Sequence, residues 1–174
     1  GGLAAIHSKY IGRYYISSDC EKILEAGKEI SFKSIVRPVE LAQPNSQSSD
    51  VVKHAYNEII RDENIKIVVV IHANVGTISS FMIDECIEIM LENQEYSSVI
   101  PCHTMDEYHP LRAMKVNMNG YMIPFMDNLP DTISANRQEL GECLFYDHSF
   151  WVLDVEKGIL SENGQKPWPV MGNK

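Results

Sequence analysis

The chain has 174 residues, of which 44% are hydrophobic and 22% are charged. This composition is typical of one globular domain and excludes a disordered, collagen-like or coiled-coil chain. The net charge of −9, from 15 basic and 24 acidic residues, argues against nucleic acid or an anionic membrane surface as a partner.

The first two thirds of the chain alternate predicted helices and strands. The caps of three helices are predicted at Asp19, at Ser48 or Ser49, and at Ser79 or Ser80. In chain order we predict a helix over 3–6, a strand over 14–18, a helix over 21–28, a strand over 34–36, a helix over 49–61, a strand over 67–71, a helix over 80–92 and a strand over 97–101. The β-branched run at 67–71 favours a parallel strand that is covered on both faces.

After residue 103 the pattern changes to short strands. Strands near 111–117 and 121–125 flank Asn119-Gly120, which predicts a hairpin with a type I′ turn, and an aromatic strand follows around 150–153. We therefore expect a three-layer α/β/α sandwich with a mostly parallel sheet, plus a small β-hairpin region. Residues 1–174 are expected to form a single domain with a hairpin insertion at 104–135. The abrupt start inside a helix suggests that segments are missing at this end.

The cysteines are widely spaced and include no C-x-x-C pair; they are Cys20, Cys86, Cys102 and Cys143. Reduced thiols in a cytosolic protein fit this spacing better than a disulfide framework or a structural zinc site. The chain also contains neither a signal peptide nor an apolar run of roughly 18 residues, the length that a membrane span needs. We therefore predict a cytoplasmic location without a membrane partner.

Ligands of open α/β sheets bind at the carboxyl ends of the strands. Three of the five arginines, Arg37, Arg112 and Arg137, fall in non-helical stretches near these ends and suggest an anionic small molecule. Each candidate also has an ordinary structural interpretation: a loop arginine is often a solvated charge, His72 can be a hydrogen-bonded structural histidine, and Trp151 can belong to the core. The P-loop, dinucleotide, zincin and hydrolase motifs are absent. A metal site formed by Cys102, His103 and His109 is disfavoured because no partner at a fixed spacing supports it.

Several segments together resemble the acylneuraminate cytidylyltransferases, the CMP–sialic acid synthetases. The matching segments, in the order of that family, are Ser8-Lys9-Tyr10-Ile11, Ile16-Ser17-Ser18-Asp19, Arg37-Pro38-Val39-Glu40-Leu41-Ala42, Asp50-Val51-Val52 with His54-Ala55, His109-Pro110-Leu111-Arg112 and Asn136-Arg137-Gln138. The resemblance covers nearly the whole chain. It is most specific in R-P-x-E-L-A followed by D-V-x-x-H-A.

The resemblance implies a nucleotidyltransferase-like fold and a CTP-dependent enzyme that needs Mg²⁺. Its substrates would be CTP and a nine-carbon α-keto sugar acid, its products the CMP-sugar and pyrophosphate, and its quaternary structure a homodimer docked or exchanged through the hairpin region. By position, Arg37 and Ser48 resemble the nucleotide contacts of the family. The residues that match sugar-acid contacts are His72, Arg112, Arg137, Gln138, Asp147 and Trp151.

The chain departs from the family in ways that leave alternatives open. The N-terminal phosphate loop and the C-terminal D-x-D metal pair have no counterpart in this sequence, so the catalytic residues and metal ligands stay unassigned. His72 replaces a glutamine and Asp147-His148-Ser149 replaces an N-G-A turn, which leaves the identity of the sugar acid open. The alternatives are a non-catalytic relative that binds a sugar acid or a nucleotide, and a nucleotidyltransferase for another sugar.

Overall fold

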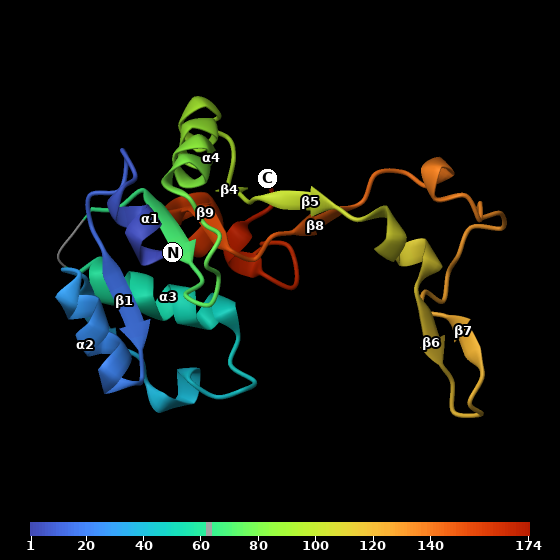
Figure 1. The fold of residues 1–174 in the computed structure, drawn as a ribbon, viewed down its shortest axis with the longest axis horizontal. Coiled ribbons are helices and arrows are strands. Elements are labelled where there is room, and N and C mark those ends of the chain that lie inside the picture. The colour runs from blue at the N-terminus through green and yellow to red at the C-terminus, as the bar shows by residue number, and fades with distance from the viewer. Residues whose placement is uncertain (62–63) are drawn as a thin grey trace. The chain divides into compact units, whose positions relative to one another are not determined.

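The computed structural model describes residues 1–61 and 64–174, which form two compact units (Figure 1). Unit 1 comprises residues 1–101 and 148–174, and unit 2 comprises residues 102–147. The insertion predicted at 104–135 lies entirely within unit 2. No helix among the described residues is long and apolar enough to cross a membrane.

The first half of unit 1 contains a parallel pair of strands. β1 (Tyr15–Ser18) pairs with β2 (Lys33–Val36), and α2 (Glu21–Glu29) connects them. Gly27 lies against β1, because a Cβ at this position would come within 2.5 Å of the Ile16 side chain. The small residue therefore lets α2 pack closely on the strand.

A three-stranded sheet forms the rest of the core of unit 1. β9 (Phe150–Asp154) is the central strand, and both β3 (Ile67–Ile71) and β4 (Ser98–Val99) pair with it in antiparallel direction. Side chains of β9 alternate between two hydrophobic clusters. Trp151 and Leu153 pack with residues of α3 (Ser48–Ile59), whereas Phe150 and Val152 pack with residues of α4 (Ser80–Glu92). Helices therefore cover both faces of this sheet (Figure 1).

The pairing of β3 differs from the sequence prediction. We expected a parallel strand over 67–71, and the prediction of the pairing was wrong because the neighbour is β9, which runs in the opposite direction. A β-branched run reports burial on both faces but not the identity of the adjacent strand. Among the described residues β1–β2 is the one parallel pairing, so the mostly parallel three-layer sandwich is not confirmed.

The predicted helix caps have mixed outcomes. Ser79 caps α4, its hydroxyl accepting a hydrogen bond from the Met82 N–H, and the predicted bounds 80–92 of this helix are confirmed. The caps predicted for α2 and α3 were wrong: their N-cap residues are Cys20 and Gln47, and neither side chain makes a capping bond. The N-cap of α2 is the residue after Asp19, and the N-cap of α3 is the residue before Ser48.

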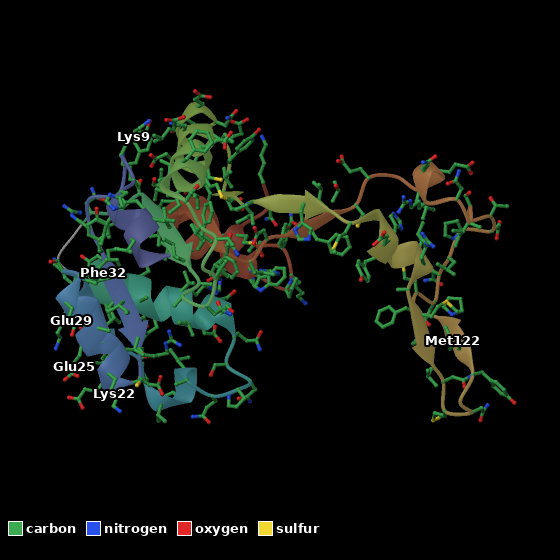
Figure 2. The ribbon with its side chains drawn as sticks, in the orientation of Figure 1. Lys9, Lys22, Glu25, Glu29, Phe32 and Met122 are labelled. Carbon is green, nitrogen blue, oxygen red and sulfur yellow. The ribbon has the colours of Figure 1, made fainter. Side chains whose placement is uncertain are left out.

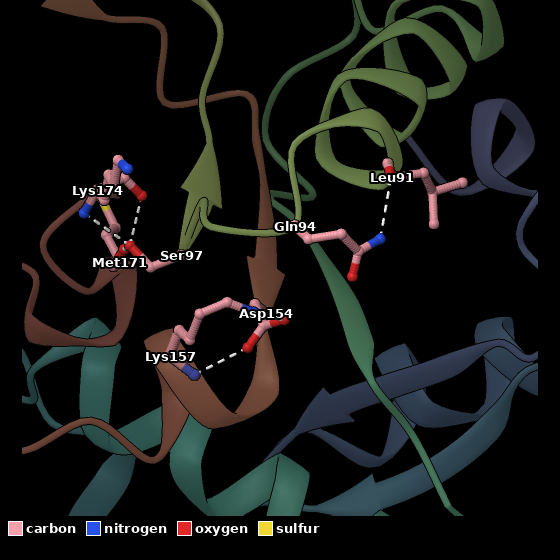
Figure 3. A network of polar contacts seen from close by, with 7 residues as sticks. All are labelled: Leu91, Gln94, Ser97, Asp154, Lys157, Met171 and Lys174. Atoms are coloured by element: carbon pink, nitrogen blue, oxygen red, sulfur yellow. Dashed lines mark hydrogen bonds and ion pairs between the residues drawn. The ribbon is translucent and has the colours of Figure 1, made fainter.

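Residues near the end of the chain contact Ser97 in unit 1 (Figure 3). The single hydrogen of the buried Ser97 hydroxyl is shared between the carbonyl oxygens of Met171 and Lys174, at 2.8 and 2.5 Å, and the hydroxyl oxygen accepts from the Lys174 N–H at 2.9 Å. Gly172 lies beside Ser97 and has a φ of 69°. A Cβ atom at position 172 would lie 2.4 Å from the Cβ atom of Ser97. Only glycine can occupy position 172 without backbone strain or a steric clash.

Short helical segments complete the molecule. They are α1 (Gly2–Ile6), η1 (Val39–Leu41), η2 (Asp106–Tyr108), η3 (Pro110–Arg112), η4 (Arg137–Glu139), the π-helical η5 (Val155–Ile159) and η6 (Pro169–Met171).

Unit 2 is built from two antiparallel strand pairs. β5 (Cys102–Thr104) pairs with β8 (Leu144–Tyr146), and β6 (Met114–Val116) pairs with β7 (Met122–Pro124). The hairpin at Asn119-Gly120 is confirmed, but its turn is not type I′, because Gly120 has positive φ and Asn119 does not. The Gly120 N–H bonds to the Asn117 carbonyl, and the Asn117 N–H bonds to the Tyr121 carbonyl. This pattern is that of a three-residue loop whose glycine forms a bulge.

Unit 2 has no buried side chain among its described residues, the side chain of Asp106 not being described. The hairpin exposes Met114, Val116 and Met122 on one face, and Met122 is labelled in Figure 2. The exposed large apolar residues of the whole unit are Met105, Tyr108, Met114, Val116, Met118, Tyr121, Met122, Phe125, Met126, Leu144 and Tyr146.

Candidate functional site

Arg37 follows β2 and is held by the end of β1. Its backbone N–H donates to the Ser18 carbonyl at 2.9 Å. Its side chain donates from Nη2 to the Ser17 carbonyl at 2.7 Å and from Nε to the Ser17 hydroxyl at 3.3 Å. No carboxylate pairs with Arg37 among residues 1–61 and 64–174, so the positive charge stays available to a ligand.

Ser48 is the first residue of α3 and is exposed. The next residue, Ser49, is buried, and its hydroxyl has no hydrogen-bond partner among the described residues. Ser49 lies on the inward face of α3, which continues through Val52 and Tyr56. A buried hydroxyl without a partner is costly, so this position favours water or a ligand group.

His72 and Trp151 come together in a cluster with His148 and Trp168, which we call the imidazole–indole cluster. The centroids of the His72 and Trp151 rings are 4.9 Å apart in an edge-on arrangement. The His148 ring lies 6.3 Å from Trp151 and 4.6 Å from Trp168. β3 and β9 create this proximity, because the backbone N–H of His72 bonds to the Ser149 carbonyl just before β9 begins.

Three buried polar atoms in and beside this cluster have no hydrogen-bond partner among the described residues. They are His72 Nε2, Trp151 Nε1 and the Ser149 hydroxyl. Trp151 can only donate, and a neutral histidine nitrogen donates or accepts according to its tautomer. Burial, and secondarily the charge of His148, lower the pKa of His72 and favour its neutral form. The cluster therefore offers hydrogen bonds without carrying a fixed charge at His72.

Four predicted site residues belong to unit 2. Arg112 ends η3 and is exposed, and Arg137 is half-exposed, with its Nη1 3.4 Å from a carboxylate oxygen of Glu107. The backbone N–H of Gln138 donates to the Asn136 side chain. Asp147 is half-buried, and its charge adds to burial in raising the pKa of the Cys102 thiol.

The structure therefore divides the predicted site residues between the two units. Arg37, Ser48, His72 and Trp151 lie in unit 1, and within it His72 and Trp151 are in ring contact. A common cleft for Arg37, Arg112 and Arg137 stays a prediction.

Two open depressions, of about 320 and 360 Å³, flank β2, and no predicted site residue lines either of them. Their lining residues are Asp19, Glu21, Leu24, Lys28, Ser34 and Val36 in the first, and Tyr15, Lys33, Ser34, Ile35, Val36, Glu58 and Ile59 in the second. These depressions therefore do not locate the candidate site.

Sequence reasoning did not assign Ser17, Ser49, His148, Ser149 and Trp168 to the site. Trp168 was detectable in part, because it is one of only two tryptophans in the sequence. The role of Ser17 could not be anticipated, since serine is common at strand ends and its contact with Arg37 joins residues 20 positions apart.

Comparison with known proteins identifies the fold. No family model matches the chain. The solved structure of CMP:2-keto-3-deoxy-manno-octonic acid synthetase complexed with CTP is similar, with a TM-score of 0.60 and 11% sequence identity. The similarity covers 89% of this chain and 61% of that protein, so the chain spans less than two thirds of the length of the protein it matches. At this identity the comparison establishes a shared mixed α/β fold.

The lowered pKa of His72 predicts how stability depends on pH. The folded state resists protonation of His72 more than the unfolded state, so stability should be full above the unfolded pKa of 6.5 and fall as the pH drops below it. In His72→Gln the free energy of unfolding should therefore decrease less steeply between about pH 8 and pH 5. Urea titrations across this range measure the effect. The exposed His7 provides the matched control, since His7→Gln should keep the steeper wild-type dependence. An equally steep pH dependence of the free energy of unfolding in His72→Gln and wild type would contradict a lowered pKa of His72.

Proposed function

We propose that this chain is part of a CTP-dependent cytidylyltransferase, which transfers CMP to a nonulosonic, sialic-acid-like sugar acid and releases pyrophosphate. The observation that carries the proposal is the fold shared with a CMP-sugar acid synthetase that was solved with CTP. The order of the sequence motifs supports the proposal independently, because R-P-x-E-L-A is followed by D-V-x-x-H-A as in the family. The first motif lies on the segment after β2, which includes η1, and the second lies on α3.

The proposed reaction is an in-line displacement at phosphorus. The anomeric hydroxyl oxygen of the sugar acid forms a bond to the α-phosphorus of CTP while the bond to the bridging oxygen breaks, and pyrophosphate leaves. The hydroxyl proton passes to solvent. Because CTP and a carboxylate are both anionic, the protein must hold them together against their repulsion, mainly by positioning and charge neutralisation.

Arg37 and Ser48 are the proposed nucleotide contacts. Arg37 is suited to this role because its guanidinium is bonded to a neutral carbonyl and a hydroxyl, which leave its charge uncompensated. Ser48 stands at the first turn of α3, where the positive end of the helix dipole favours a polar or anionic group.

The proposed sugar-acid contacts are the residues that match the family's sugar-acid contacts by position in the sequence. His72 and Trp151 are proposed contacts to uncharged polar groups of the sugar, since each has a buried nitrogen atom without a hydrogen-bond partner among the residues that the structure describes. Arg137 would hold the carboxylate. Arg112, Gln138 and Asp147 are the other proposed contacts to the sugar acid. The exposure of Arg137 and its long contact to Glu107 leave it free to exchange this partner for a substrate carboxylate.

Magnesium belongs to the proposal only as a component of the reaction mixture. No group of three metal-binding side chains occurs among the residues that the structure describes. We assign no protein ligand to the ion and derive no catalytic step through it.

The finer architecture also remains part of this proposal. Covering of the β3–β9–β4 sheet by α3 and α4 on opposite faces supports a three-layer sandwich, although the hydrogen-bonded pairings in this sheet are antiparallel. A cytoplasmic location is proposed on the composition of the sequence and on its scattered cysteines.

Unit 2 is the proposed dimerisation element. An isolated two-stranded hairpin is marginally stable in water, and unit 2 consists of two such pairs without a buried side chain among its described residues. The apolar face formed by Met114, Val116 and Met122 carries no charged residue, which suits burial against the same face of a second copy.

Nucleotide binding and turnover test the proposed reaction. CTP with magnesium chloride, at about 100 times its Kd, should raise the melting temperature by on the order of 5–10 °C, and UTP and GTP should raise it less. In a panel of nonulosonic acids that includes sialic, legionaminic and pseudaminic acids, pyrophosphate should be released only when CTP and one of these sugar acids are both present. Binding of CTP without pyrophosphate release would favour the non-catalytic relative, and selective stabilisation by UTP or GTP would favour a transferase for another sugar.

Two arginine variants should separate the two substrates. Arg137→Ala should raise the KM for the sugar acid and lower kcat, about tenfold or more in kcat/KM, while CTP affinity stays nearly unchanged. Arg37→Ala should weaken CTP binding by a similar factor and leave the KM for the sugar acid nearly unchanged. Calorimetric titration with CTP and initial rates of pyrophosphate release measure both. Equal loss of CTP binding in the two variants would contradict these roles.

A charge on the apolar face of unit 2 should abolish dimerisation. Wild-type protein at micromolar concentration should elute with twice the monomer mass in light-scattering chromatography, and Met122→Asp should elute as a monomer. Phe81→Asp is the matched control, because Phe81 is 72% exposed on α4 in unit 1. A monomeric wild type, or a dimeric Met122→Asp, would rule out this interface.

A further inference from the structure

We infer that Ser17 positions Arg37 for nucleotide binding, by fixing the guanidinium across the end of β1. This inference rests on the proposed nucleotide role of Arg37. Ser17 supplies two acceptors to the same guanidinium: its carbonyl oxygen, 2.7 Å from Nη2, and its hydroxyl oxygen, 3.3 Å from Nε. Ser17 is a positioning residue and touches no substrate in this account.

The register of β1 and β2 explains why the Ser17 carbonyl is available. In this parallel pair the Lys33 N–H bonds to the Tyr14 carbonyl and the Arg37 N–H bonds to the Ser18 carbonyl. Peptide groups alternate in direction along a strand, so the carbonyls of Tyr14 and Ser18 point toward β2 and that of Ser17 points away from it. The Arg37 side chain therefore crosses the end of β1 to satisfy an acceptor that β2 does not use.

The same contacts leave part of the guanidinium for a ligand. Arginine has five N–H donors, and the two bonds to Ser17 use one on Nε and one on Nη2. Three donors remain, two of them on Nη1. Because Ser17 fixes its Nε and Nη2 edge, the guanidinium loses less rotational freedom when a ligand binds than a mobile arginine would. This smaller entropy loss should increase the affinity for the ligand.

Both the backbone and the side chain of Arg37 are hydrogen-bonded to β1. The Arg37 N–H bonds to Ser18 and its guanidinium bonds to Ser17, so both ends of the residue are fixed to consecutive positions of β1. The side chains of Ser17 and Arg37 are both half-buried, which strengthens these bonds relative to exposed ones. Removing the Ser17 hydroxyl leaves the carbonyl contact in place, so a partial effect is expected.

A double-mutant cycle on CTP affinity tests the inference. Calorimetric titration of CTP compares wild type, Ser17→Ala, Arg37→Ala and the double variant. Ser17→Ala should raise the Kd for CTP about three- to fivefold in the wild-type background, and it should have no effect once Arg37 is alanine. Ser17→Thr, which keeps the hydroxyl and suits a strand, should restore wild-type affinity. Ser34→Ala, a serine on the neighbouring strand β2, is the matched control and should bind CTP as wild type does.

Each other outcome has a definite meaning. An equal effect of Ser17→Ala in both backgrounds would overturn the inference, because the loss would then not act through Arg37. Wild-type affinity in Ser17→Ala together with weak binding in Arg37→Ala would overturn it while leaving the proposed function intact. Wild-type affinity in Arg37→Ala, or no CTP binding by the wild type, would overturn both. If Ser17→Ala does not fold, Ser17→Cys replaces the hydroxyl by a weaker acceptor of similar size and is read against the same cycle.

Discussion

Unit 1 depends on the burial of β9 on both of its faces. Phe150, Trp151, Val152 and Leu153 are each at most 1% exposed, and they point alternately toward α4 and α3. Full burial of such side chains contributes about 1.5–3 kcal/mol each. Because β9 pairs with both β3 and β4, its burial also fixes the two strands beside it. The contact between His72 and Trp151 in the candidate site follows from this one strand.

The pairing of β3 with β9 brings the end of one strand to the start of the other. His72 follows β3, Ser149 precedes β9, and a backbone hydrogen bond joins them. The Trp151 ring then lies edge-on to the His72 ring, with the two centroids 4.9 Å apart. A second element of the site arises in the same way at the parallel pair, where the end of β1 holds Arg37 after β2. In both places backbone pairing between strands positions a side chain that directly follows a strand.

Unit 2, unlike unit 1, is not organised around a buried strand among its described residues. It exposes aromatic and methionine side chains and contains no buried one among the residues described there. Its internal order comes from backbone pairing in β5–β8 and β6–β7, and from surface contacts such as the ion pair of Lys115 and Asp127, which gains little in water. Removal of such apolar surface from water is favourable, which is the physical reason for proposing unit 2 as a contact surface.

The sequence by itself determined the local elements of this protein. Helix 80–92 with a cap at Ser79 or Ser80, a strand at 14–18 that is observed as Tyr15–Ser18, the strand at 67–71 and the hairpin at Asn119-Gly120 follow from periodicity, capping and turn chemistry, which act over a few residues. The tertiary structure alone decided which strands are neighbours, that β3 and β4 flank a strand from residues 150–154, and that Ser17 holds Arg37. These facts depend on contacts between residues far apart in the chain, and periodicity carries no information about such partners.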